Sequence, residues 1–250
     1  MGEDMRLRGW FLKAKMRIVP FLFTSNDMHC YLKEQNVSVG EGTIFYNPGT
    51  ITIDTSRPCL LQIGKHCKIT SGVVVLTHDY SRSVLRRVYG EVLGEAGKTV
   101  IGDNVFIGMN SIILMGSKIG SNVIVGAGSV VSGRIPDNVV VAGNPARIIR
   151  TLDEQYRIRK IRVVDEAVLY TQEFERMYGR VPDIRELDPF YHLFMPRDME
   201  EVRKHGLRMK LGGDNEEEII HAFLNSEAMF DGYEGFMAYY REKTYGKSGV

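Results

Sequence analysis

Hydrophobic residues recur at every sixth position through the middle of the sequence. Starting at Ile101, the period meets an aliphatic side chain at each visit up to Val131, and the next residue is usually glycine. The same phase runs upstream from Val39 to Val75 and fails only at Arg57. A helix would need apolar recurrence at three and four residues, so this pattern predicts short strands joined by tight turns. The apolar positions, aliphatic except for Phe45, are Val39, Phe45, Ile51, Ile63, Ile69, Val75, Ile101, Ile107, Ile113, Ile119, Val125 and Val131.

A repeat of this kind predicts a solenoid, in which stacked coils bury one aliphatic side chain from each strand in a continuous ladder. We assign the solenoid to residues 37–150. Between Val75 and Ile101 the spacing is no longer a multiple of six, and residues 78–98 are predicted to form an excursion loop. Loops of that length without structure of their own are usually functional or disordered. The side chains that favour binding over disorder are Tyr80, Tyr89 and Glu91.

The segments on either side of the solenoid have helical patterns. Residues 1–36 alternate basic and bulky apolar side chains. We interpret them as a helical cap over the first coil rather than a helix resting on an anionic membrane, because bulky residues such as Trp10 need only one buried surface. Residues 151–250 are predicted to form an α-helical C-terminal extension, in which one apolar stripe ends before Gly179 and Asn215 begins a later helix.

Composition is that of an ordinary globular protein and limits the classes of function. The formal net charge is +1, with 44% hydrophobic and 25% charged residues, so nucleic acid is not expected as the principal partner. The three cysteines have no CxxC spacing, which argues against a zinc site, a redox pair or a disulfide framework. The longest apolar run, Ile18 to Phe23, is too short to span a bilayer, and no signal peptide opens the chain. We therefore expect a reduced, cytoplasmic protein.

Three motifs accompany the repeats, namely "LTHDYS" at 76–81, "VGAGSVV" at 125–131 and "IPDNVVVAGNPARII" at 135–149. Together with the repeats they resemble the hexapeptide-repeat acyltransferases, most of all the maltose, galactoside and polysaccharide O-acetyltransferase branch. The expected fold is mainly β, a left-handed parallel β-helix with a helical N-terminal cap and an α-helical C-terminal extension. The resemblance also implies a homotrimer with active sites between subunits, and acetyl-CoA as co-substrate in a groove between neighbouring β-helices.

His78 stands where the last regular strand before the excursion ends, and it is the strongest catalytic candidate. An imidazole is largely neutral at near-neutral pH and can accept the proton of an attacking hydroxyl or amine. From position alone, a turn histidine that only bonds the backbone is an equal interpretation, whereas the resemblance implies a general base. The implied reaction is direct attack on acetyl-CoA. A covalent route is not favoured, because Cys67 falls at a buried corner and Ser81 and Ser83 have no identifiable partner.

The resemblance also implies residues that bind the two substrates. Asn47 and Asp54 match acceptor-pocket positions, although Asn47 also fits a simple turn and Asp54 can instead orient the imidazolium. In the loop, Tyr80 and Glu91 are the acceptor-binding candidates. Arg134 stands one position after the family's usual lysine, where it pairs with a CoA phosphate or is a solvated surface residue. The residues expected to bind the cofactor are Met109, Ala127, Ser132, Arg134 and Arg147.

The leading hypothesis is an acetyl-CoA-dependent O-acetyltransferase that acts on a sugar or polysaccharide hydroxyl. An N-acetyltransferase or a xenobiotic acetyltransferase on the same fold is the close alternative. A metal-dependent hydratase of the carbonic anhydrase type would need about three converging histidines. The repeats offer only His66 and His78, so no metal is expected. A non-enzymatic trimeric scaffold is the remaining alternative, and the excursion with its histidine argues against it.

Overall fold

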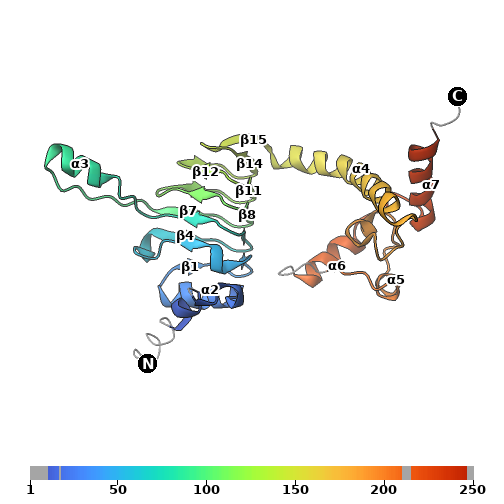
Figure 1. The fold of residues 1–250 in the computed structure, drawn as a ribbon, viewed down its shortest axis with the longest axis horizontal. Helices are drawn as coiled ribbons and strands as arrows, with labels where there is room; N and C mark the ends of the chain where they lie inside the picture. The colour runs from blue at the N-terminus through green and yellow to red at the C-terminus, as the bar shows by residue number, and fades with distance from the viewer. Residues whose placement is uncertain (1–10, 17, 210–214, 247–250) are drawn as a thin grey trace. The chain divides into compact units, whose positions relative to one another are not determined.

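The structure, a computed structural model, describes residues 11–16, 18–209 and 215–246. The chain forms two compact units, Met1–Gln155 and Tyr156–Val250 (Figure 1). The expectation for Trp10 lies outside the described residues. The three-part division drawn from the sequence remains a prediction.

The first unit contains a left-handed parallel β-helix, as the family resemblance implied, and its stacked coils are those that the repeats predicted (Figure 1). Strands from successive coils pair in parallel and build three sheets. The first sheet contains β1 (Ser38–Val39), β4 (Leu61–Ile63), β7 (Thr99–Ile101), β10 (Lys118–Ile119) and β13 (Arg134–Ile135). The second contains β2 (Ile44–Phe45), β5 (Lys68–Ile69), β8 (Val105–Ile107), β11 (Val123–Val125), β14 (Val139–Ala142) and the antiparallel β15 (Arg147–Thr151). The third contains β3 (Thr52–Ile53), β6 (Val74–Val75), β9 (Ile112–Ile113) and β12 (Val130–Val131).

The core of the first unit is a set of aliphatic ladders, one behind each sheet. In the third sheet, Ile53 pairs with Val75 and Val75 with Ile113, and the last two are fully buried. The sequence phase had placed Ile51 in this ladder. The 3-10 helix η2 (Pro48–Thr50) takes up two extra residues at the preceding corner, so Ile53 enters the strand pair and Ile51 is buried at the corner instead.

Small polar side chains fill the corners between the sheets. Ser111 and Ser129 are fully buried, and both hydroxyls donate to the carbonyl of Gly126, at 3.0 and 2.6 Å. Asparagines occupy other corners in the left-handed backbone region, where the amide of Asn104 donates to Asn122 in the next coil (2.9 Å). These bonds satisfy polar groups that the stacking of coils removes from water.

Helices close the first coil. The 3-10 helix η1 (Pro20–Leu22) leads into α2 (Ser25–Glu34). Leu12, Met28 and Leu32 are buried in the same core as the aliphatic ladders, which is the packing that the predicted cap requires. Within the described ranges, no helix is long and apolar enough to cross a membrane.

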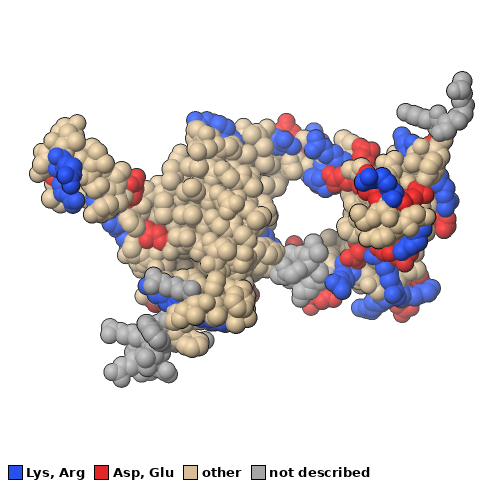
Figure 2. Space-filling view, viewed as in Figure 1, with Lys and Arg blue, Asp and Glu red and all other residues tan. Residues whose placement is uncertain are grey.

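The excursion between β6 and β7 contains a helix that the sequence analysis did not predict. α3 (Arg82–Tyr89) ends at Gly90, whose φ of 73° suits glycine. Figure 2 shows Lys and Arg gathered at the outer end of this excursion, where α3 carries its arginines. Ser81, a residue type that commonly begins a helix, was the signal that could have identified α3, although its side chain makes no cap hydrogen bond. A shorter interruption between β3 and β4 contains η3 (Pro58–Leu60).

The second unit is helical, as predicted, and has its own core. It comprises most of α4 (Leu152–Tyr178), then η4 (Asp188–Leu193), α5 (Met199–Lys204), α6 (Glu216–Leu224) and α7 (Gly232–Tyr245). Asn215 begins α6 by accepting a hydrogen bond from the backbone N–H of Glu217 (3.0 Å). Aromatic side chains dominate the core, where Phe194 stacks on Phe236 with ring centres 5.8 Å apart.

Candidate active site

His78 and Asp54 lie side by side at the corner where the chain passes from the third sheet to the first. Asp54 follows β3 and His78 follows β6, and these strands are neighbours in the third sheet. The Nδ1 atom of His78 is 2.6 Å from Oδ2 of Asp54. The side chain of His78 is 34% exposed and that of Asp54 only 8%. The imidazole is therefore held through Nδ1, while part of the ring remains open to a substrate.

Asp54 accepts hydrogen bonds at both carboxylate oxygens. Oδ1 accepts from the backbone N–H and the hydroxyl of Ser56, at 3.0 and 2.6 Å. Oδ2 accepts from the backbone N–H of Thr77 (3.0 Å), from the Thr77 hydroxyl and from His78. Burial by itself would raise the pKa of Asp54, but these hydrogen bonds outweigh burial and hold its pKa well below the usual range. An ionised carboxylate only accepts, so Nδ1 of His78 carries the hydrogen, and in the neutral form of the ring Nε2 has the lone pair.

Sequence reasoning missed Ser56 and Thr77, which hold this carboxylate in place. Thr77 lies inside the "LTHDYS" motif and is fully buried. Ser56 follows Asp54 by two residues, and this spacing is typical of a turn in which an aspartate accepts from the backbone two residues on. That spacing was the signal that could have identified Ser56.

The other predicted acceptor-binding residues do not meet His78 within one chain. Asn47 lies at the corner between the second and third sheets, in the left-handed region with φ 51°. One side of the triangular coil therefore separates Asn47 from His78. In the excursion, Tyr80 is 61% exposed, with the guanidinium of Arg82 5.0 Å from its ring centre. Glu91 is exposed just after α3.

The predicted CoA-binding residues divide among different parts of the coil. Met109 and Ala127 lie in successive coils at the corner between the second and third sheets. Ser132 lies at the corner between the third and first sheets, Arg134 begins β13 in the first sheet, and Arg147 begins β15. These residues do not converge on one site within a single chain.

A groove of about 550 Å³ on the first sheet contains Arg134 and two lysines that sequence reasoning missed. Lys118 pairs with Arg134 across β10 and β13, and Lys98 directly precedes β7. Asp137 also lines the groove, where its carboxylate accepts a backbone hydrogen bond from Ser121 (2.8 Å). The step from Lys118 to Arg134 is 134 − 118 = 16 residues, two fewer than three repeats of six, so the repeat alone would not have placed these two cations together.

The positions of Cys67 and His66 disfavour two other chemistries. Cys67 is fully buried, its thiol donates to the carbonyl of Gly102 (3.1 Å), and burial raises its pKa. A buried thiol of this kind is a poor nucleophile. His66 lies at the corner between the first and second sheets, away from the corner that holds His78. In the part of the chain that the structure describes, no group of three His, Cys, Asp or Glu residues is placed to hold a metal ion.

Comparisons with known proteins identify the repeats. The family profile "Bacterial transferase hexapeptide (six repeats)" matches residues 98–133. "Protein CapG" of Staphylococcus aureus is 46% identical over 122 residues, which cover 49% of this chain and 70% of that protein. "Galactoside O-acetyltransferase" of Lactococcus lactis is 28% identical over 150 residues, covering 57% of this chain and 70% of that one. A hexapeptide-repeat acetyltransferase from Vibrio cholerae, solved as a complex with acetyl coenzyme A, is 25% identical with a TM-score of 0.44, covering 60% of this chain and 88% of that chain.

The coil architecture and these matches define a transferase built on hexapeptide repeats. The chain belongs to the hexapeptide-repeat acetyltransferase family.

Proposed function

We propose that this acetyltransferase transfers the acetyl group of acetyl-CoA to a hydroxyl of a sugar or polysaccharide, with His78 as the general base. The observation that carries the proposal is the 2.6 Å contact between Nδ1 of His78 and the buried carboxylate of Asp54. A partly exposed imidazole, held by an ionised carboxylate at the root of a long excursion, is suited to proton transfer.

Asp54 fixes the tautomer in which Nε2 of His78 has a free lone pair. This nitrogen takes the proton of the acceptor hydroxyl as the hydroxyl oxygen attacks the thioester carbonyl carbon of acetyl-CoA. The resulting tetrahedral oxyanion collapses, the C–S bond breaks, and the imidazolium returns the proton to the departing sulfur. The products are the acetyl ester and CoA with a free thiol. The ionised Asp54 stabilises the imidazolium while it exists, so it lowers the barrier as well as orienting the ring.

The cations of the groove on the first sheet support the binding of CoA. Lys98, Lys118 and Arg134 line it, and CoA carries several phosphate groups that such a row of cations attracts. Arg134 then supplies the positive charge that the family's usual lysine would supply from the preceding position. Met109 and Ala127 are assigned to the pantetheine arm at the other corner.

The separation of Asn47 from His78 supports a homotrimer with active sites between subunits. A site that uses both residues needs the corner between the second and third sheets of one copy beside the corner between the third and first sheets of the next. This contact is heterologous, and three copies arranged around a threefold axis close it into a ring.

A hydroxyl-rich acceptor is supported by the polar groups assigned to the acceptor site. The amide of Asn47 both donates and accepts, the carboxylate of Glu91 accepts from hydroxyls, and Tyr80 offers a ring face and a hydroxyl. The similar protein of Lactococcus lactis is named as an O-acetyltransferase of galactosides. The test must distinguish this hydroxyl acceptor from an amine acceptor.

The test is acetyl-CoA-dependent thiol release with mono- and oligosaccharides, amines and buffer alone. We expect saccharide-dependent release, and His78→Ala should lower kcat/KM by about 10²- to 10⁴-fold while acetyl-CoA still binds. His205→Ala is a matched control, because His205 is 33% exposed, lies 3.8 Å from the carboxylate of Glu201 and is in the helical unit. Full activity in His78→Ala would contradict the general base. Release with amines alone would replace the saccharide by an amine, and absence of both acetyl-CoA binding and release would favour a scaffold.

A further inference from the structure

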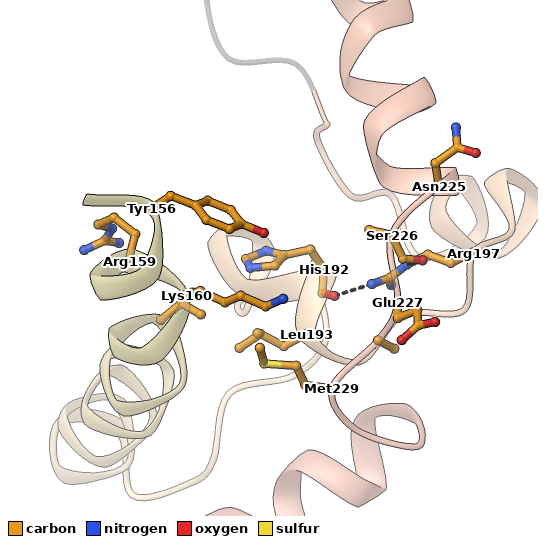
Figure 3. A pocket seen from close by; sticks show the side chains of 12 residues that line it. Tyr156, Arg159, Lys160, His192, Leu193, Arg197, Asn225, Ser226, Glu227 and Met229 are labelled. Atoms are coloured by element: carbon orange, nitrogen blue, oxygen red, sulfur yellow. Dashed lines mark hydrogen bonds between the residues drawn. The ribbon is translucent and has the colours of Figure 1, made fainter. Parts of the chain in front are cut away.

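The second unit contains a pocket of about 840 Å³ that the proposed acetyl transfer does not use (Figure 3). Its walls come from three stretches that are distant in sequence: the first turns of α4, η4 with the residues after it, and the segment between α6 and α7. Pockets that bind small organic ligands commonly have volumes of roughly 300–1,000 Å³. The size is therefore that of a site for a small molecule or a few sugar units.

Arg197 joins two walls of this pocket, and its guanidinium donates hydrogen bonds only to neutral groups. Its guanidinium donates to the backbone carbonyls of His192 (2.8 Å), Met195 (2.6 Å) and Ser226 (3.0 Å). Among the described residues, no carboxylate forms an ion pair with it. Burial lowers the pKa of Arg197, but a guanidinium keeps its charge at neutral pH. A guanidinium has five N–H donors, and those not used by the three carbonyls are free for a ligand.

Lys160 and His192 extend the polar surface toward the centre of the pocket. The ammonium of Lys160 lies 6.0 Å from the ring centre of Tyr156 and points into the pocket in Figure 3. Arg159 differs, since Glu166 already pairs with it through two hydrogen bonds of 2.7 and 2.8 Å. The ring of His192 is half-buried and makes no hydrogen bond to any residue the structure describes. Burial lowers its pKa, so the neutral ring offers one donor and one acceptor.

The rest of the lining combines one acid with apolar side chains. Glu227 can accept hydrogen bonds from hydroxyls, while Leu193 and Met229 supply apolar surface. Glu166 already neutralises Arg159. The remaining charged residues of the lining are Lys160, Arg197 and Glu227, which give a net charge of about +1. The complementary ligand is anionic and has several hydroxyls and an apolar ring face.

We propose that this pocket binds an acidic saccharide, a sugar that bears a carboxylate or phosphate group. The anionic group lies between Lys160 and Arg197, the hydroxyls face His192 and Glu227, and Tyr156 covers the ring. The identification of the ligand as a sugar rests on the proposed function, whereas its negative charge follows from the pocket alone. The helical unit is then a glycan-binding module joined to the acetyltransferase.

The test is a titration of the full-length chain, with labelled methionine methyl groups, against trigalacturonate, glucose 6-phosphate and maltotriose. We expect an acidic sugar to shift the signal of Met229, which lines the pocket, and neutral maltotriose to bind at least about tenfold more weakly. Lys160→Ala should weaken acidic-sugar binding about tenfold, and Lys160→Arg should restore most of it. Arg157→Ala removes a charge from the same helix outside the pocket and should leave the affinity unchanged.

Binding of trigalacturonate alone assigns the anionic group as a carboxylate, and binding of glucose 6-phosphate alone assigns it as a phosphate. Equal affinity for maltotriose, an unchanged affinity in Lys160→Ala, or no shift of Met229 with any of the three sugars would overturn the proposal. If acetyl-CoA turnover fails while binding that depends on Lys160 persists, the proposed function is wrong and the pocket assignment stands.

Discussion

Replacing Asp54 by asparagine tests how the candidate site works, because the substitution keeps the side chain's shape and removes its charge. If the amide oxygen takes the Oδ1 position, the amide nitrogen faces the backbone N–H of the buried Thr77, and two donors oppose each other. If the oxygen takes the Oδ2 position, the nitrogen faces the backbone N–H and the hydroxyl of Ser56. Ser56 is exposed, so its hydroxyl can turn to accept and water can take up its N–H. The second orientation is favoured, and in it His78 still donates from Nδ1.

Asp54→Asn therefore keeps the tautomer and loses the charge, which allows the effect on rate to be worked out. A hydrogen bond to a charged group contributes about 1.5–3 kcal/mol and one between neutral groups about 0.5–1.5 kcal/mol. The difference, roughly 1–1.5 kcal/mol, acts on the imidazolium of the transition state and corresponds to a decrease in kcat of about five- to twelvefold. Asp54→Ala should reduce kcat further, because it leaves the N–H of Thr77 unpaired and the imidazole free to turn.

The assay is thiol release from acetyl-CoA, with kcat and the KM for the acceptor measured separately. Asp103→Asn is the control, since Asp103 accepts a backbone hydrogen bond from Lys65 (2.7 Å) at another corner of the coil. We expect kcat to fall in Asp54→Asn with little change in KM. A raised KM at unchanged kcat would mean that Asp54 binds the acceptor. A kcat as low as that of His78→Ala would refute the argument that the tautomer is retained.

Two further predictions concern the coil stack and the cationic groove. Ile113→Ala removes a fully buried ladder residue and should lower the free energy of unfolding of the first unit by about 2–5 kcal/mol, measured by urea denaturation; an unchanged midpoint would contradict the ladder. Lys118→Ala should raise the KM for acetyl-CoA about three- to tenfold, less at high salt, because a cation beside Arg134 is lost. An equal rise in Lys65→Ala, which removes an exposed lysine outside the groove, would contradict that assignment.

The β-helix was predictable because its signal is local and repeated. Each aliphatic such as Ile113 is buried for the same reason as the residues six positions before and after it. The phase was wrong at Ile51, where η2 takes up two residues and Ile53 joins the ladder. Composition identified Asn47, Pro48 and Gly49 as a turn, but it does not specify how many residues a turn contains.

His78 and Asp54 were predictable members of the candidate site, whereas Ser56 and Thr77 were missed. His78 and Asp54 were identified by motif, but their contact depends on the register of β3 against β6, which the corner lengths decide. Lys118 was missed for the same reason, because it gains importance only when β10 lies beside β13 and Arg134. The pocket of the helical unit has no signal in sequence, since Lys160 and Arg197 come together only through tertiary packing.

The position of Asp54 explains why the catalytic candidate lies at this corner. The two interruptions of the six-residue period, after β3 and after β6, lie one above the other, because these strands are neighbours in the third sheet. Where two neighbouring strands end, backbone N–H groups lose the partners that a continued sheet would supply. Asp54 replaces those partners by accepting from the N–H groups of Ser56 and Thr77. The carboxylate that satisfies the backbone after both strands is thereby placed against His78, the first residue of the excursion. One side chain therefore serves both the fold and the proposed chemistry.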